Sequence, residues 1–217
     1  MTQSQVVVLD LDGVIIKSNF IKHRAMLSLF ESTPEHTEAI SAFILANGGV
    51  PRKVKISAIL ENILGVQATP TVVADYLSRY ASKLEDFLHS APLVEGVAAF
   101  VTSSDCTFYV SSSAPEGEVA SQLARTGLLA YFSAVFGRDT PKASALAEVK
   151  RRHRGLTPIF FGDSVSDLRA AQEANVAFVA VICERDNFAG YEVHKLKDFS
   201  SIQLVQQCIN DLVDRRS

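Results

Sequence analysis

The sequence predicts an α/β protein, with a Rossmann-like, three-layer parallel sheet as its core and an inserted block of helices. Short apolar runs such as Val6–Leu9 alternate with helical segments over residues 90–217, which is typical of βαβ units. Consecutive positions in these runs are apolar, as in strands that helices cover on both faces. By contrast, residues 18–89 carry helical patterns without a clear strand.

The first predicted strand, Val6–Leu9, runs directly into Asp10-Leu11-Asp12-Gly13. Ligands of open parallel sheets bind beyond the carboxyl ends of the strands, and Gly13 allows the chain to turn sharply there. Two acids in a turn also occur as solvated residues that hydrogen-bond to nearby backbone. This stretch by itself therefore leaves both interpretations open.

Residues 18–89 are predicted to form an α-helical cap subdomain. Apolar residues recur at helical spacing in four segments. Thr33-Pro34 and Thr69-Pro70 each suggest a helix start, because threonine is a suitable N-cap and proline is favoured at the first helical position. The predicted core domain then comprises residues 1–17 and 90–217.

The core elements follow in regular alternation. The sequence predicts strands at 106–110, 134–136, 158–161 and 176–182, and helices at 94–101, 116–126, 168–175 and 201–213, with a further helix starting at Thr140-Pro141-Lys142.

Polar side chains follow the predicted strands where each strand ends. They are Asp10 and Asp12, Ser111 to Ser113, Lys142, and Asp163 with Asp167. We expect them along one edge of the sheet, where they suit phosphoryl transfer. A carboxylate is ionised at neutral pH and can attack phosphorus, and carboxylates are ligands for Mg²⁺. A lysine and a hydroxyl can hold the phosphate oxygens as their charge develops.

Composition limits the class of protein. The net charge is -3, so there is no basic excess for broad binding to nucleic acid. The three cysteines form no CxxC pair, which favours a reducing compartment over disulfides or zinc. Neither a signal peptide nor a bilayer-spanning run is visible. We expect a cytoplasmic protein without nucleic-acid or membrane partners, as a monomer or homodimer.

The four groups of polar residues, in this order, resemble the four motifs of the haloacid dehalogenase-like (HAD) hydrolase superfamily. The helical insertion resembles the cap of its phosphoglycolate phosphatase and β-phosphoglucomutase branch. This resemblance implies that Asp10 is the nucleophile, which forms an aspartyl-phosphate, and that Asp12 is the general acid and base. It also implies that Ser112 and Lys142 bind the phosphate.

The same resemblance implies an Mg²⁺ site made by Asp10, the backbone carbonyl of Asp12, Asp163 and Asp167. The resemblance also favours Ser112 as the second-motif hydroxyl, because members of the family often carry this hydroxyl three residues before a proline, which here is Pro115. Ser111 is the competing choice, and Ser111 and Ser113 are both expected to contact substrate.

The leaving group is expected to be chosen by the cap, and its loop at residues 47–55 is the predicted specificity segment. Gly49 would permit close approach, and Arg52 could reach an anionic group of a small phosphorylated metabolite. Basic residues in such a loop are often only solvated. The presence of Asp12 favours phosphate-ester chemistry within the family.

Three functions remain open from the sequence. The first is an Mg²⁺-dependent phosphatase for a sugar phosphate or a phosphoglycolate-like compound. The second is a sugar phosphomutase of the β-phosphoglucomutase type, which returns the phosphoryl group to its substrate. The third is a non-catalytic module that binds a phosphorylated ligand, although such a module would not need both Asp10 and Asp12.

Overall fold

The computed structural model describes residues 5–47, 50–88 and 90–214. Its internal contacts divide the chain into two compact units, Met1–Lys17 with Pro92–Ser217 and Ser18–Ala91. We call the first the core unit and the second the helical unit, and each is described by itself.

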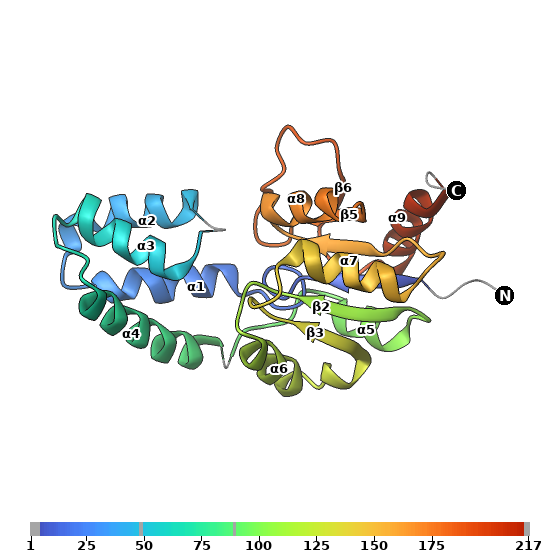
Figure 1. Cartoon of the computed structure of the whole chain (residues 1–217), viewed down its shortest axis with the longest axis horizontal. Coiled ribbons are helices and arrows are strands. Elements are labelled where there is room, and N and C mark those ends of the chain that lie inside the picture. Colours follow the sequence, from blue (N-terminus) through green and yellow to red (C-terminus); the bar gives the residue numbers. More distant parts are fainter. Residues whose placement is uncertain (1–4, 48–49, 89, 215–217) are drawn as a thin grey trace. The chain divides into compact units, whose positions relative to one another are not determined.

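Within the described part of the core unit, six strands form one parallel sheet in the order β3-β2-β1-β4-β5-β6 (Figure 1). The strands are β1 (Val6–Leu9), β2 (Thr107–Ser111), β3 (Phe132–Phe136), β4 (Ile159–Gly162), β5 (Ala177–Val181) and β6 (His194–Leu196). The predicted parallel α/β core is confirmed. The edge strand β6 was not predicted, because His-Lys-Leu is too short and too polar to stand out as a strand.

Helices cover both faces of this sheet (Figure 1). They are α5 (Val97–Ser103), α6 (Glu116–Arg125), α7 (Lys142–Arg152), α8 (Val165–Glu173) and α9 (Ile202–Asp214). On one face, Leu146 of α7 and Leu168 of α8 pack in a cluster with Phe160. On the other, the ring of Phe100 in α5 lies 5.2 Å from that of Phe108. The strands β1, β4 and β5 are buried at every position, which explains why their sequences carry no polar side chain.

The central strand β1 shows this most clearly, since all four of its residues are fully buried. Val8 pairs with Tyr109 of β2 on one side and with Phe160 of β4 on the other. The register therefore places the residue after β1, Asp10, beside the ends of both neighbouring strands.

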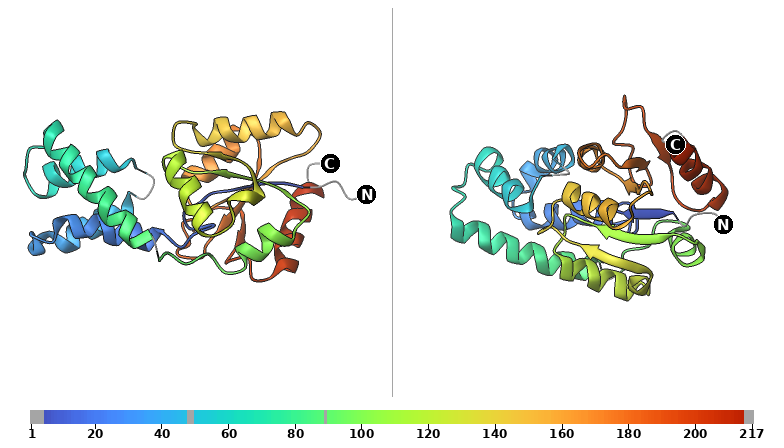
Figure 2. Two further views of the ribbon diagram at one scale, coloured as in Figure 1. Left: turned by 90° about the horizontal axis from the view of Figure 1, so that it is seen from below. Right: turned by 45° about the vertical axis from the view of Figure 1, so that its right-hand side comes forward.

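The helical unit contains α1 (Asn19–Leu27), α2 (Thr37–Ala46), α3 (Arg52–Ala58) and α4 (Pro70–Leu88). The long helix α4 packs against α1 and α3 (Figure 2). Ile40, Ile56 and Leu84 belong to its buried apolar core. The third segment differs from a single regular helix, because a π-helical turn, Ile59–Ile63, follows α3.

The two chain segments that join the units are paired inside the core unit. Ile16 and Leu93 form an antiparallel bridge, and the backbone N–H of Lys17 donates to the carbonyl of Pro92 over 2.9 Å. Lys17 and Glu95 add an ion pair of 2.5 Å. None of the helices described here is both long enough and apolar enough to cross a membrane.

Candidate active site

The site lies where the sheet topology reverses direction. From β1 the chain eventually returns through α5 to β2, whereas from β4 it passes through α8 to β5 on the opposite face (Figure 1). Open α/β sheets bind ligands at the carboxyl ends of the strands at such a switch point. Asp10 follows β1 and Asp163 follows β4, so both acids lie at this position.

Asp10 is held by β4, by α7 and by the backbone of its own loop. Its side chain is buried, and its backbone N–H donates to the carbonyl of Phe161 over 2.9 Å. Its Oδ1 accepts a hydrogen bond of 2.7 Å from the N–H of Leu11. Its Oδ2 lies 2.9 Å from Nζ of Lys142. The carboxylate is therefore fixed in one orientation before any ligand binds.

The loop after Asp10 is a compact turn. The N–H groups of Ile15 and Ile16 both donate to the carbonyl of Leu11, and Gly13 adopts a φ of 73° that side chains rarely tolerate. Asp12 is half-buried in this turn. Its carboxylate interacts electrostatically with that of Asp10.

Asp163 and Asp167 come from the β4–α8 connection. Ser164 is the N-cap of α8, and the Ser164 hydroxyl and Asp167 form a reciprocal capping box. Asp167 Oδ2 accepts from the Ser164 N–H over 3.1 Å. Asp167 is fully buried, so the local start of a helix also fixes a carboxylate in the site.

Gly162, the last residue of β4, allows this close packing. A Cβ atom at Gly162 would lie only 2.4 Å from the Cβ of Asp167. The position therefore requires glycine for lack of space, because Asp167 cannot retreat without breaking its capping box.

We expect Gly162→Ala to lower the free energy of unfolding by about 1–3 kcal/mol, the usual cost of overpacking. Thermal melts would measure this effect. Gly117→Ala in α6 is the matched control, because a Cβ there would meet nothing within 4 Å. Equal behaviour of the two variants would contradict the steric explanation.

Lys142 is the first residue of α7, directly after its N-cap Pro141. The sequence suggested Thr140 as the cap, whereas proline itself occupies that position. Lys142 Nζ lies 2.9 Å from Asp10 Oδ2 and 2.5 Å from Asp167 Oδ1. A cation at a helix N-terminus is unfavourable by itself, so these two carboxylates explain its placement.

The pKa values of Asp10 and Lys142 are both shifted far from their ordinary values. Burial raises the pKa of Asp10 from 3.8 to about 7, with opposition from Lys142 and further raising by Asp167 and Asp12. For Lys142, burial acts to lower the pKa, but Asp10 and Asp167 outweigh it and raise the pKa above its ordinary value. This group therefore contains more carboxylates than cations, which favours the binding of a positively charged ligand beside them.

The raised pKa of Asp10 makes a pH-dependent prediction for metal-free protein. Because this pKa is higher in the folded state, the stability that the protonated carboxyl contributes is present below about pH 4. It is lost as the pH rises through about 7. In EDTA, Asp10→Asn should therefore have a higher Tm than the wild type at pH 8. The difference in Tm should be smaller at pH 5. A difference of the same size at both pH values would contradict this.

The serine run after β2 divides into three environments. Ser112 is buried, its N–H donates to the carbonyl of Phe136 over 2.9 Å, and its Oγ accepts from the Ala114 N–H over 3.1 Å. Ser111 is fully buried, and its Oγ has no hydrogen-bond partner among the described residues. Ser113 is exposed. Because the Ser112 Oγ is the acceptor in its bond with Ala114, the Ser112 hydroxyl can donate its proton to a different group.

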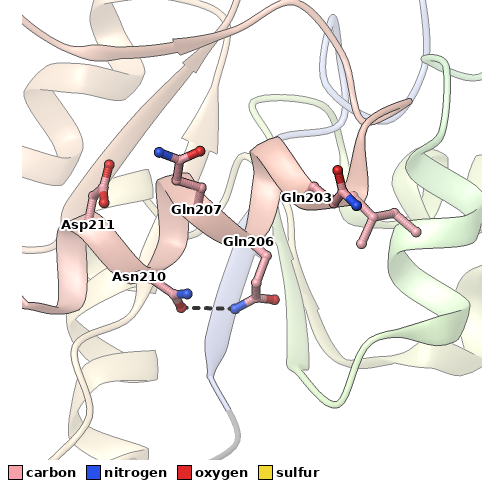
Figure 3. Close-up of a pocket in the computed structure, with 6 residues that line it drawn as sticks. Gln203, Gln206, Gln207, Asn210 and Asp211 are labelled. Atoms are coloured by element: carbon pink, nitrogen blue, oxygen red, sulfur yellow. Dashed lines mark hydrogen bonds between the residues drawn. The ribbon is translucent and has the colours of Figure 1, made fainter.

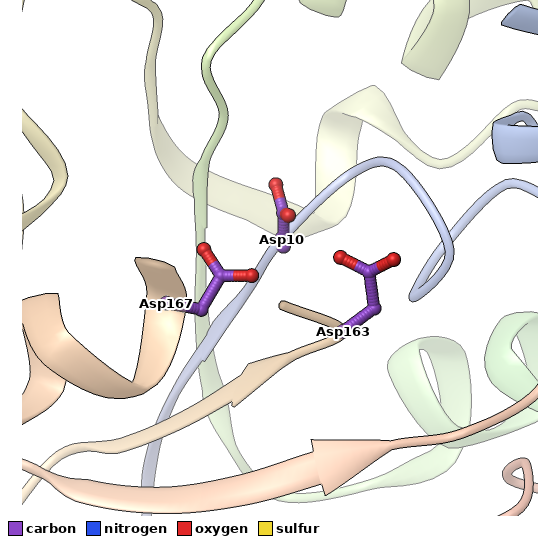
Figure 4. A group of neighbouring side chains, drawn as sticks. All are labelled: Asp10, Asp163 and Asp167. Carbon is purple, nitrogen blue, oxygen red and sulfur yellow. The ribbon is translucent and has the colours of Figure 1, made fainter. Parts of the chain in front are cut away.

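Three carboxylates converge at the switch point, those of Asp10, Asp163 and Asp167 (Figure 4). One oxygen from each lies within 4.8 Å of the others. Opposite ligands of an octahedral Mg²⁺ are about 4.2 Å apart, so small rotations would bring these oxygens onto one ion. The donor set therefore fits a hard divalent cation. Asp12 contributes no side-chain oxygen to this group.

The helical unit contains the other predicted substrate residues. Gly49 lies outside the described residues. The Arg52 guanidinium lies 5.2 Å from the centre of the Tyr80 ring. Lys55 is half-buried, and burial lowers its pKa, with additional lowering by Lys22 and Arg52. A group of three cations in this unit is suited to an anionic ligand group.

A surface hollow of about 550 Å³ lies elsewhere, along α9 (Figure 3). Its lining is mostly made of side-chain amides, and Gln206 donates to Asn210 over 3.1 Å. It shares no residue with the carboxylate group.

Two residues of the site were missed from the sequence. Ser164 had a signal, because Ser164-Val165-Ser166-Asp167 has the spacing of a capping box. Gly162 had no sequence signal beyond its place at a strand end. Only the packed position of Asp167 shows why a side chain is excluded there.

The doubly wound parallel sheet, with carboxylates and a lysine at its switch point, places the protein in the class of Rossmann-like α/β proteins that bind ligands at the carboxyl ends of their strands. Residues 7–181 match the profile of the family described as haloacid dehalogenase-like hydrolase. The chain therefore belongs to the haloacid dehalogenase-like hydrolase family.

Comparison with individual proteins agrees with this. The chain is 25% identical over 185 residues to a phosphoglycolate phosphatase of Rhodobacter capsulatus, covering 79% of this chain and 81% of the relative. A predicted phosphoglycolate phosphatase from Haemophilus somnus superposes with a TM-score of 0.76 at 17% identity, over 95% of this chain and 100% of the other. A Thermotoga maritima protein provisionally assigned as a β-phosphoglucomutase superposes with a TM-score of 0.70 at 20% identity, over 94% of this chain and 98% of the other.

Proposed function

We propose that the protein is an Mg²⁺-dependent phosphatase that hydrolyses a small phosphorylated metabolite through an aspartyl-phosphate. One observation carries the proposal: the buried carboxylate of Asp10 is fixed 2.9 Å from Lys142 and converges with Asp163 and Asp167. A binding module would need positive or neutral groups for a phosphate, whereas a buried carboxylate at the same place repels it. A carboxylate there is useful as a nucleophile.

In the first step, an oxygen of Asp10 attacks phosphorus as the bond from phosphorus to the ester oxygen breaks. Asp12 donates a proton to the departing oxygen, which leaves as an alcohol. Lys142 and the Ser112 hydroxyl balance charge on the phosphoryl oxygens during transfer. Asp10 needs no general base when it attacks as a carboxylate; Lys142 opposes the rise of its pKa, and a bound Mg²⁺ would favour the ionised form further.

In the second step, Asp12, now ionised, takes a proton from water as the water oxygen bonds to phosphorus. The bond from phosphorus to Asp10 breaks, releasing inorganic phosphate and restoring the carboxylate. Asp10, Asp163 and Asp167 would hold Mg²⁺, which supplies positive charge to the phosphoryl group and offsets the repulsion between anions. The Asp12 carbonyl is proposed as a further ligand.

A panel of phosphorylated metabolites with Mg²⁺ tests this proposal. Release of inorganic phosphate supports a phosphatase, whereas conversion of a sugar phosphate into its isomer without release supports the phosphomutase alternative. The structural similarity to the assigned β-phosphoglucomutase makes the second readout worth including. If no compound in the panel reacts, and p-nitrophenyl phosphate does not react either, the enzymatic proposal is wrong.

The helical unit is proposed to select substrates with a second anionic group. Arg52→Gln should raise KM for phosphoglycolate about tenfold, the effect of losing a charge-assisted hydrogen bond, and leave KM for p-nitrophenyl phosphate unchanged. Lys53→Gln, at an exposed neighbouring position, is the control. Equal changes in KM for both substrates would contradict a role of Arg52 in selection.

A further inference from the structure

A hydrogen bond from outside the four motif segments reaches the backbone of Asp163. Asn187 lies in the connection between β5 and β6, and its Nδ2 donates to the carbonyl oxygen of Asp163 over 2.9 Å. Asn187 is half-buried, and it precedes Phe188, which is fully buried. The contact joins a long surface connection to a proposed metal ligand.

The connection is anchored on both sides of Asn187. The Phe188 ring packs 5.6 Å from that of Phe178 in β5. Asp186 Oδ1 accepts from the Phe188 N–H over 2.8 Å, and Asp186 Oδ2 pairs with Lys195 at 2.9 Å. These contacts restrain the backbone on both sides of Asn187, so less backbone entropy is lost when Asn187 forms the hydrogen bond to Asp163.

The peptide group between Asp163 and Ser164 is held at both of its polar atoms. Its carbonyl accepts from Asn187, and its N–H, which belongs to Ser164, donates to Asp167 Oδ2 over 3.1 Å. A planar peptide that is restrained at both ends cannot rotate freely. Because this plane sets the direction of the Asp163 side chain, the same clamp relates the carboxylates of Asp163 and Asp167.

We propose that Asn187 is a positioning residue for the divalent-metal site, acting through the Asp163–Ser164 peptide and not through contact with metal or substrate. The inference rests on the proposed function, since it assumes a metal at Asp10, Asp163 and Asp167. Supporting groups of this kind affect metal affinity, because ligands that are free to turn lose more entropy on binding.

The test is calorimetric titration of the purified, metal-stripped protein with Mg²⁺ alone. Asn187→Leu keeps a side chain of similar shape and removes the N–H donor, and Asn187→Ala removes both. Each should raise the Kd for Mg²⁺ about tenfold, the lower end of the effect of groups that support metal ligands. The KM for p-nitrophenyl phosphate, measured at saturating Mg²⁺, should stay near that of the wild type.

Lys195→Met is the matched control, because it breaks the Asp186–Lys195 pair in the same connection and leaves Asn187 in place. Melting curves in EDTA establish that each variant is folded at the titration temperature. If Lys195→Met weakens Mg²⁺ binding as much as Asn187→Leu, general loosening of the connection explains the result and the proposal is wrong. Wild-type Kd values in both Asn187 variants would overturn it as well.

Failure of this inference is distinguishable from failure of the proposed function. A wild-type protein that does not bind Mg²⁺ would overturn the proposed metal site and, with it, the role of Asn187. A wild-type protein that binds Mg²⁺ and releases phosphate, with unaffected Asn187 variants, would overturn only the role of Asn187.

Discussion

Asp10→Asn is expected to lower kcat for phosphate release by about 10⁴-fold or more, the scale seen when a nucleophile is removed. An amide is a poor nucleophile and cannot form the aspartyl-phosphate, while its size and hydrogen-bonding atoms remain close to those of the carboxylate. Single-turnover assays with p-nitrophenyl phosphate at saturating Mg²⁺ would measure the loss.

Asp139→Asn is a suitable control, because the Asp139 side chain is 92% exposed and outside the site. The variant should retain wild-type kcat. Full turnover by Asp10→Asn would rule out the covalent mechanism, even if the protein hydrolyses phosphate esters by another route.

Lys142→Met is expected to destabilise metal-free protein by about 3–5 kcal/mol, because it leaves two buried carboxylates without their cation. For a chain of this size, such a loss lowers Tm by roughly 10 °C. Asp10 and Asp167 lie within 2.9 Å and 2.5 Å of Nζ, and the lysine side chain is only 12% exposed. Addition of Mg²⁺ should recover part of the loss, since the ion supplies positive charge to the same carboxylates.

Lys150→Met provides the comparison within the same helix. Lys150 donates to the carbonyl of Asn175 over 2.8 Å at an exposed position, so its replacement should change Tm little. If Lys142→Met and Lys150→Met have the same Tm in EDTA, the buried ion pairs of Lys142 contribute less to stability than their geometry indicates.

The parallel core could be predicted because a strand that is buried on both faces appears in the sequence as an uninterrupted apolar run. Val6–Leu9 and Ile159–Phe161 consist of apolar residues that have to be covered on both faces. Strand β6, His194–Leu196, could not be found in this way, since it pairs with β5 at the sheet edge and needs no long apolar run. The π turn after α3 was also missed, because helical spacing does not distinguish it from a continued α-helix.

The sequence by itself determined the α/β class and the order of the chemistry-bearing residues, because strand ends are local features and parallel strands end at one edge. Only the tertiary structure decided which of these residues meet. Asp12 contributes no side-chain oxygen to the three converging carboxylates, and Ser111 and Ser112 are both buried, whereas Ser113 is exposed. Asn187 reaches Asp163 from 24 residues away, and no local pattern records such a contact, since it depends on how β4 and β5 pack.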